Sequence, residues 1–399
     1  MAKLSSIAYY VTDKISSNDI SLAEYVTTDC ILQNKKGREV ATNLPPQPCS
    51  LIRYQRGDVL IANIRPYLKK VWFADIDGGA SPDVLVFRAK DGHSPSFLYA
   101  ILLQDSFFDY VMQGTKGSKM PRGDKEQILR YEMPTFSCSE ESIGTFFLNL
   151  DRKIHLNERI NQNLEAMAKQ LYNYWFVQFD FPNEEGKPYK SSGGKMVWNE
   201  KLKREIPFGW HCGNLFEIAV FTNGLACQKF RPKDDEASLP VIKIREMHDG
   251  ISADTEKVTP NIPESVKVYN GDVLFSWSAS LEVMLWAYGL GGLNQHIFKV
   301  TSANDFPKSF FYFQLLDYVD VFKKMAEARK TTMGHITQDH LQQSAIAIPD
   351  NKDIADRFEE LISPIFNQII KLHEEILNLT KQRDKLLPLL MNGQVSVNS

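Results

Sequence analysis

Residues 141–175 of the chain, ESIGTFFLNLDRKIHLNERINQNLEAMAKQLYNYW, decide its fold. Apolar side chains recur in this stretch at alternating spacings of four and three, the heptad pattern of a helix that packs along another helix. A helix of about 35 to 38 residues is roughly 50 to 57 Å long, which is more than one small domain covers. We therefore expect it to pair with a second helix, and packing on its own domain is the simpler alternative. The seam consists of Ile143, Phe147, Leu150, Ile154, Asn157, Asn161, Leu164, Ala168, Leu171 and Trp175.

The same seam returns 215 residues later in the chain, with one polar exception, Arg383. Asn157 and Asn161 lie on the first seam, where a buried amide selects one register and orientation. Ser363-Pro364 is typical of a helix start or a bend in the second pattern, and Asn392-Gly393 of a helix end. The second seam consists of Phe358, Ile362, Ile365, Ile369, Leu372, Ile376, Leu379, Arg383, Leu386 and Leu390.

The parts of the chain before each seam are also duplicated. Gly57-Asp58-Val59-Leu60 recurs as residues 271–274, Ser96-Phe97-Leu98-Tyr99 matches residues 309–312, and Pro134 matches Pro349. Short β-rich runs alternate with helical stretches, which indicates mixed α/β domains. We predict an α/β fold with two pseudo-symmetric domains, each followed by a long helix, and the two helices pairing as an antiparallel coiled coil. The expected boundaries are a first domain 1–139, helix 140–178, linker 179–206, second domain 207–349 and helix 350–393.

Composition places the chain among ordinary globular proteins. It has 399 residues, of which 43% are hydrophobic and 24% charged, and this excludes disordered and collagen-like classes. No apolar window reaches the length of a membrane span and the start lacks a signal peptide, so we expect a cytoplasmic protein. The five cysteines are widely spaced and odd in number, which argues against a disulfide framework or a zinc site.

Motifs for catalysis are absent from the sequence. Residues 114–119, GTKGSK, are glycine-rich but lack the spacing of a phosphate-binding loop, so ATP hydrolysis is not expected. His335 and His340 have a spacing that a metal site tolerates, but ordinary surface histidines explain them better. We expect no catalytic residue, no metal and no cofactor on this chain.

Positive charge gathers in loops at corresponding places of the two halves, although the net charge of the chain is −3. Lys and Arg in such loops suit phosphate contacts, while Ser, Thr, Gln and His suit base edges. The alternative for any single residue is an ordinary solvated charge. The candidates in the first half are Lys35, Lys36, Arg38, Arg65, Tyr67, Lys69, Lys70, Lys116, Ser118, Lys119 and Arg122; those in the second half are Lys229, Arg231, Lys243, Arg245, Trp277, Ser278, Gln295, His296, Lys330, Thr331, Thr332 and His335.

These features together resemble the DNA-specificity subunits of type I restriction-modification systems over essentially the whole chain. The resemblance rests on the duplicated Gly-Asp-Val-Leu, on Leu293 to Lys299, on the Pro134 and Pro349 strand ends, on Tyr174 to Val177 and Leu389 to Gly393 of the seam helices, and on the segment from Asp180 to Trp210. It implies that each globular part is a target recognition domain that reads one half of a bipartite, asymmetric DNA site. The helices would set the spacing between half-sites and dock the modification subunits.

The resemblance further implies which partners the chain has. These are double-stranded DNA, two methyltransferase (modification) subunits and restriction/translocase subunits, with no membrane. S-adenosylmethionine, ATP and magnesium would belong to those partners. Two other classes compete with this hypothesis: a free-standing nuclease or methyltransferase, for which no motif is found, and a coiled-coil scaffold without sequence-specific DNA binding.

Overall fold

The computed structural model describes residues 2–117, 119–133, 139–233, 236–252, 254–278, 280–328 and 336–391. Its contacts divide the chain into two compact units. Unit 1 is Met1–Asn157 together with Asn378–Ser399, and unit 2 is Glu158–Leu377. Both long helices cross the division, so each unit holds a stretch of each helix.

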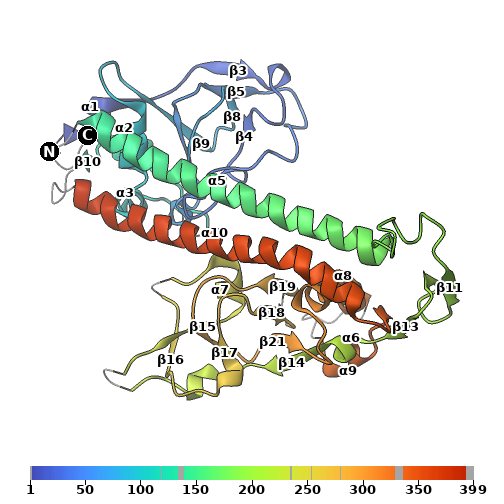
Figure 1. Ribbon diagram of the computed structural model, residues 1–399. Helices are drawn as coiled ribbons and strands as arrows, with labels where there is room; N and C mark the ends of the chain where they lie inside the picture. Colours follow the sequence, from blue (N-terminus) through green and yellow to red (C-terminus); the bar gives the residue numbers. More distant parts are fainter. Residues whose placement is uncertain are drawn as a thin grey trace. The chain divides into compact units, whose positions relative to one another are not determined.

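Unit 1 is built on two four-stranded sheets (Figure 1). The first has the order β2-β9-β6-β7 and is antiparallel throughout. The second has the order β3-β5-β8-β4, with β4 and β8 parallel. The strands are β2 Ala8–Tyr10, β3 Lys14–Ser16, β4 Tyr25–Val26, β5 Ser50–Tyr54, β6 Val59–Ala62, β7 Val71–Phe73, β8 Gly78–Ala80 and β9 Val84–Ala89, with β1 Ala2–Lys3 pairing β10 Glu132–Met133; the helices are α1 Leu4–Ile7, α2 Pro95–Leu102, α3 Asp105–Gln113 and α4 Lys125–Leu129.

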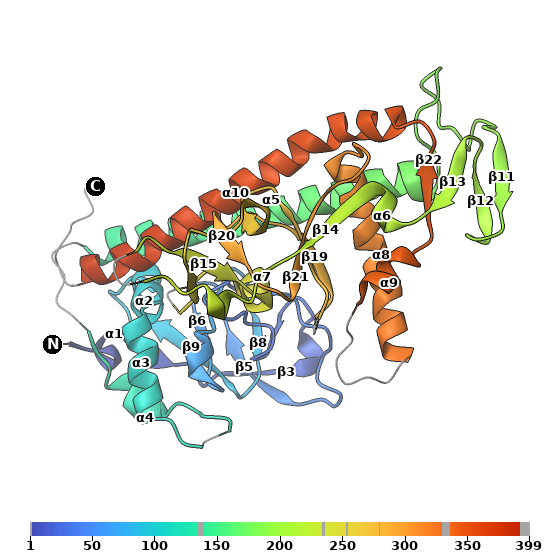
Figure 2. The ribbon, with the colours of Figure 1, turned by 90° about the horizontal axis from the view of Figure 1, so that it is seen from below.

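Unit 2 repeats this plan. The sheet β14-β21-β18-β19 is antiparallel, and the sheet β16-β15-β20-β17 again contains one parallel pair, β15 with β20. Figure 2 shows the hairpin of β11 and β12 and the pair of β13 with β22 at one end of the unit. The strands are β11 Met196–Asn199, β12 Arg204–Pro207, β13 Trp210–Gly213, β14 Ala219–Asn223, β15 Leu239–Ile242, β16 Lys257–Val258, β17 Lys267–Val268, β18 Val273–Ser276, β19 Glu282–Leu285, β20 Gly291–Leu293, β21 Ile297–Ser302 and β22 Ile346–Pro349; the helices are α6 Leu215–Ile218, α7 Ile244–Asp249, α8 Lys308–Ala328 and α9 Gln338–Gln342.

The repeated Gly-Asp-Val-Leu motif has a structural role in both units. Its aspartate opens a strand and is held by a cation on the neighbouring strand. Asp58 accepts two hydrogen bonds from Arg88, both at 2.8 Å, and Asp272 lies 2.8 Å from the Lys299 ammonium. Each aspartate also accepts a backbone N–H three residues earlier in the chain, which closes the turn before the strand. The duplicated sequence therefore marks a duplicated strand pair.

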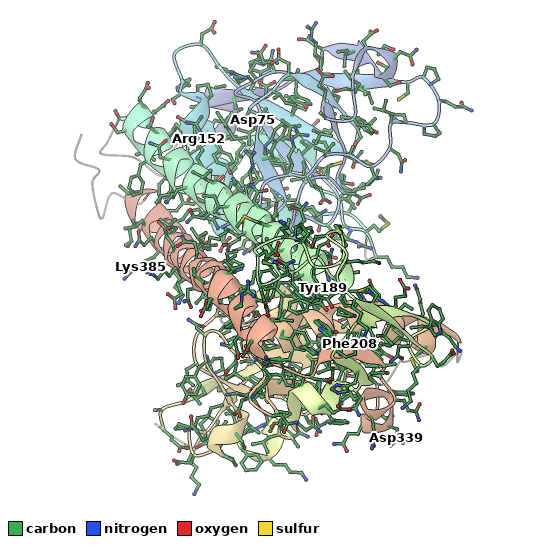
Figure 3. The ribbon with its side chains drawn as sticks, turned by 45° about the vertical axis from the view of Figure 1, so that its right-hand side comes forward. Asp75, Arg152, Tyr189, Phe208, Asp339 and Lys385 are labelled. Atoms are coloured by element: carbon green, nitrogen blue, oxygen red, sulfur yellow. The ribbon has the colours of Figure 1, made fainter. Side chains whose placement is uncertain are left out.

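The two long helices are α5, Glu140–Tyr172, which continues as a π-helical turn to Val177, and α10, Asp353–Met391. In unit 1, Asp151 of α5 meets Arg383 of α10, and in unit 2 Tyr172 of α5 meets Phe358 of α10. Residue numbers rise along one helix as they fall along the other, so the pairing is antiparallel and lies within one chain. Figure 3 labels Arg152 on α5 and Lys385 on α10, two of the exposed charged residues between the seam positions.

The predicted fold class is confirmed: the chain has two mixed α/β parts and two long antiparallel helices. Most seam residues are buried, including Ile143, Phe147, Ile154, Phe358 and Ile362. The others are buried or half-buried, and the polar exception Arg383 is also buried because Asp151 neutralises it. In the part of the chain that the structure describes, no helix is long and apolar enough to cross a membrane.

Of the two interpretations of Ser363-Pro364, a helix start is wrong, because α10 is helical from Asp353 onward and Pro364 lies inside it. The segment 179–206 is not a plain surface linker either. Phe179 and Phe181 are buried in the core of unit 2, where Phe181 stacks on Tyr189 at 4.8 Å and on Trp210 at 5.8 Å. Aromatic residues in a Gly/Pro-rich stretch decide this, since burying them outweighs the ordering cost of the loop.

Candidate nucleic-acid interface

Unit 1 brings three basic segments, far apart in sequence, onto adjoining loops. Backbone N–H groups of Asn34 and Lys35 donate to the carbonyls of Leu68 and Lys69, at 2.8 and 3.0 Å. The Arg65 N–H donates to the Pro121 carbonyl at 2.8 Å. The described residues of the segments 34–38, 65–70 and 116–122 therefore adjoin one another, and we call them the unit 1 basic loops.

The structure does not support the prediction that Lys35 contacts DNA, because its side chain is only 6% exposed. Its ammonium lies 2.8 Å from Asp105 of α3 and 3.6 Å from Asp384 of α10. Lys69 reaches the same Asp105 carboxylate at 2.9 Å. Burial would raise the pKa of Asp105, but the charges of Lys35 and Lys69 lower it overall. Lys35 therefore fixes its loop to the helices of unit 1 and is not free to meet a phosphate.

Two further candidates in unit 1 are partly engaged within the protein. The guanidinium of Arg38 lies 4.3 Å from the centre of the Trp72 ring. The ammonium of Lys70 donates to the Thr28 carbonyl at 2.7 Å. The loop itself runs close to α5, since a Cβ on Gly37 would lie 2.8 Å from the Nε2 atom of His155.

The exposed candidates of unit 1 are those that a nucleic acid can reach. The exposed side chains are Lys36, Arg65, Tyr67, Lys116, Lys119 and Arg122. Lys116, 86% exposed, lies 3.3 Å from Asp124, and Arg122, 58% exposed, lies 3.1 Å from Asp83. Such exposed pairs contribute little to stability, so breaking them to meet another anion would cost little.

Unit 2 joins its predicted segments in a similar way. The Leu225 N–H donates to the Leu293 carbonyl and the Gln295 N–H to the Leu225 carbonyl, both at 2.8 Å. The rings of Trp277 and His296 lie 5.5 Å apart, and the Trp277 indole donates to Asn223 at 3.3 Å. Residues 223–231, 277–278 and 294–296 thus adjoin one another; we call them the unit 2 loops.

The cations of unit 2 differ in how free they are. Lys229 and Arg231 are exposed, and so is His296. Lys243 is paired with Glu256 at 2.5 Å and Arg245 with the buried Glu246 at 2.6 Å. Ser278 is buried, whereas the adjacent Trp277 is half-buried and keeps part of its side chain accessible.

Five predicted residues lie outside the described part of the chain, namely Ser118, Lys330, Thr331, Thr332 and His335. Among the described residues no group of three His, Cys, Asp or Glu side chains is arranged to hold a metal. His340 instead receives the Thr337 N–H on its Nδ1 atom at 3.0 Å, at the start of α9.

Sequence reasoning missed a buried polar cluster in unit 1. The Tyr99 hydroxyl donates to Asp151 at 2.7 Å, Arg383 donates to the other oxygen of Asp151 at 3.2 Å, and the same guanidinium donates to Asp384 at 3.0 Å. Burial and the Asp151 charge raise the pKa of Tyr99 far above its usual range, so the hydroxyl stays protonated as a donor. The signal was present: Arg383 was the one polar residue on an otherwise matching seam position, and its partner Asp151 lies next to Leu150 on the first.

Comparison with known proteins gives a consistent result. Residues 207–380 match the family model of the type I restriction modification DNA specificity domain. The chain is 24% identical to the specificity subunit of the type I restriction enzyme MjaIX from Methanocaldococcus jannaschii, over 96% of this chain and 86% of that protein. It is 22% identical to the HindI specificity subunit from Haemophilus influenzae, over 98% of each chain. The crystal structure of the type I restriction-modification S subunit from M. genitalium has the same fold, with a TM-score of 0.59 at 12% identity over 98% of this chain and 95% of that one.

Proposed function

We propose that the unit 1 basic loops and the unit 2 loops each contact one half of a bipartite DNA site, because residues 207–380 match the type I restriction modification DNA specificity domain and nearly the whole chain is similar to two type I specificity subunits. The observation that carries this proposal is the joining of three separate basic segments in unit 1. Between these segments lie 26 residues (39–64) and 45 residues (71–115), so the fold and not sequence proximity brings their cations together. In such an interface, exposed Lys and Arg side chains contact the DNA phosphates and fix the position of the protein, and polar side chains between them read base edges.

The two halves of the site would differ in sequence. The unit 1 basic loops present Arg65, Tyr67 and Lys119, whereas the unit 2 loops present Trp277, Gln295 and His296. Different donors and acceptors on the two surfaces select different base pairs in the major groove. An asymmetric target is the direct consequence.

The long helices supply the spacing in this proposal. α10 has 39 residues, so it is about 58 Å long at 1.5 Å per residue. A pair of such helices is stiff enough to hold two reading surfaces a fixed number of base pairs apart, as dimeric DNA-binding proteins do with half-sites about 34 Å apart. The same helices would dock two methyltransferase subunits, and restriction/translocase subunits would complete the complex.

The chain itself is the specificity component and not the enzyme. We propose that S-adenosylmethionine, ATP and magnesium are bound by the partner subunits, and that the complex acts on DNA in the cytoplasm. The likeness of the chain to specificity subunits over nearly its full length gives no support to the scaffold hypothesis, in which the basic loops have no role.

The experiment that tests the proposal is single-molecule methylation sequencing of DNA from cells that express the chain with its modification subunit. The matched control expresses the modification subunit alone. A bipartite methylated motif that disappears with the chain is expected, and it names both half-sites at once. Identical methylation in the two cultures, with both proteins confirmed by immunoblot, would refute the proposal.

A further inference from the structure

The two units place different side chains in corresponding layers of the helix pair. In unit 1 the layer contains Asp151 of α5 and Arg383 of α10, with the Tyr99 hydroxyl donating to the aspartate. In the internal repeat, the position equivalent to Asp151 is Phe366, and the position equivalent to Arg383 is Ala168. Tyr99 is equivalent to Tyr312, the last residue of the matching motif 309–312. The Tyr312 ring meets the Phe366 ring edge-on at 5.3 Å, so the layer exists in unit 2 as well. What unit 2 lacks is the guanidinium.

A cavity of about 640 Å³ lies in unit 2 at this layer. Ala168, Phe366 and Tyr312 all line it, together with further apolar side chains of α8, α10 and β19. Its size is in the range of sites that hold small ligands or buried side chains of a partner, roughly 300 to 1,000 Å³. The cavity therefore occupies the place that Arg383 fills in unit 1.

The polar groups around the cavity favour a cation. Glu165 and Glu282 both line it. The Glu165 side chain is exposed, although desolvation at the cavity still raises the pKa of its carboxyl group, and among the residues that the structure describes no cation pairs with it. Glu282 lies 3.2 Å from His248 through an oxygen that is inaccessible to solvent. The Tyr312 hydroxyl has no hydrogen-bond partner among the described residues either.

The positive groups at the cavity are already neutralised or uncharged. Lys169 forms an ion pair with Asp317 and lies 4.8 Å from the centre of the Tyr172 ring. Burial lowers the pKa of His373, which favours the uncharged imidazole. The charge that faces an incoming group is therefore negative.

We propose that this cavity receives an arginine side chain of the modification subunit, seated as Arg383 is seated in unit 1. The alkyl stem of an arginine suits the apolar wall of Phe366 and Ile369, and its planar guanidinium suits a carboxylate and an aromatic ring at the same time. Two observations favour this occupant: the carboxylates of Glu165 and Glu282 line the cavity, and Arg383 fills the equivalent place in unit 1. The inference rests on the proposed function, since it names a contact through which the chain assembles with its modification subunit.

The test measures the dissociation constant of the purified modification subunit for full-length variants of this chain. Ala168→Arg fills the cavity with an arginine that belongs to this chain, so the arginine of the modification subunit can no longer enter. We expect this variant to weaken binding at least about tenfold, or about 1.4 kcal/mol. Glu165→Gln and Tyr312→Phe remove one polar group each with little change of volume and are expected to weaken binding roughly three- to tenfold. Ser265→Arg, an exposed change of unit 2 outside both long helices, is the matched control and is expected to bind like the wild type.

A second measurement identifies the occupant as a guanidinium. Free agmatine at about 10 mM, above the roughly millimolar affinity expected of such a fragment, should weaken binding of the modification subunit to the wild type but not to Ala168→Arg. Wild-type affinity in both Glu165→Gln and Tyr312→Phe, or no competition by agmatine, would overturn the inference while the proposed function stands. A wild-type chain that does not bind the modification subunit at all would overturn both.

Discussion

Replacing Arg383 by alanine should be among the most damaging single changes in unit 1. The substitution removes the only described cation within reach of the Asp151 carboxylate other than His155, whose Nδ1 atom lies 3.4 Å from it. The carboxylate side chain is 6% exposed and the Arg383 side chain 4% exposed. Burial alone would lower the pKa of Arg383, yet Asp384 and Asp151 raise it overall, so the guanidinium keeps its charge.

The expected magnitude follows from this burial. Breaking a buried ion pair from one side costs about 3 to 5 kcal/mol, because the remaining charge is left without a partner. At roughly 2 to 4 °C per kcal/mol for a unit of this size, the melting temperature of unit 1 should fall by about 6 to 20 °C. The double variant Asp151→Phe with Arg383→Ala installs the side chains of the unit 2 layer and should be more stable than Arg383→Ala alone, because it removes the unpaired buried carboxylate.

The assay is differential scanning calorimetry of the full chain, with hydrogen exchange in α2 and in residues 140–157 to assign the transition to unit 1. Lys381→Ala, an exposed change on the same helix, is the control and should shift stability by no more than about 0.5 kcal/mol. The reasoning is refuted if Arg383→Ala costs less than about 1 kcal/mol, or if the double variant is less stable than either single one, since the pair would then not be coupled.

Three further predictions concern the surface, the helices and pH. Replacing Lys116, Lys119 and Arg122 together by alanine should weaken DNA binding and lower the slope of log affinity against log salt by up to about 2.7, because each lost phosphate contact removes about 0.9; an unchanged slope in a salt titration would remove this loop from the interface. Inserting one heptad into both α5 and α10 lengthens the pair by about 10.5 Å, so methylation sequencing should show a spacer about three base pairs longer, while an insertion into α5 alone breaks the register and should abolish modification; an unaltered motif in the first variant would contradict the spacing role. Burial would lower the pKa of His211, but the hydrogen bonds that its imidazole donates to Asp350, at 2.6 Å, and to Glu217 raise this pKa overall. The stabilisation is therefore present below the ordinary pKa of histidine and is lost as the pH rises through the folded value. His211→Ala should therefore cost about 0.2 to 1 kcal/mol at pH 5.5 and less at pH 8.5 in urea titrations, and equal losses at both pH values would count against the ion pair.

Much of the architecture was predictable because it depends on periodicity. The apolar seam residues, such as Phe147 and Ile154, recur with the period of a helix. Because the same pattern returns 215 residues later, it predicted both long helices. The duplicated Gly-Asp-Val-Leu likewise predicted two related domains, and the matching sheet orders confirm them. The resemblance to a known family extended these local patterns to a function.

The candidate site was predictable only as a set of loops. Sequence shows where Lys35 and Lys36 lie, but not that one is buried against Asp105 while its neighbour is exposed. That difference depends on which carboxylates the fold brings near, and these come from helices seventy and more residues away. The same limit applies to Arg245, whose partner Glu246 is adjacent in sequence but is buried only in the folded unit.

The two long helices and the duplication follow from the spacing of residues along the chain, and the repeated motifs also carry its resemblance to a known family. The tertiary structure alone decided that Arg383 joins Asp151 in one unit while Ala168 leaves a cavity in the other. It also decided that Phe179 is buried in the core rather than exposed on a linker. The physical reason is that periodicity is local, whereas the cost of burying a charge or an aromatic ring depends on the neighbours that only the folded chain supplies.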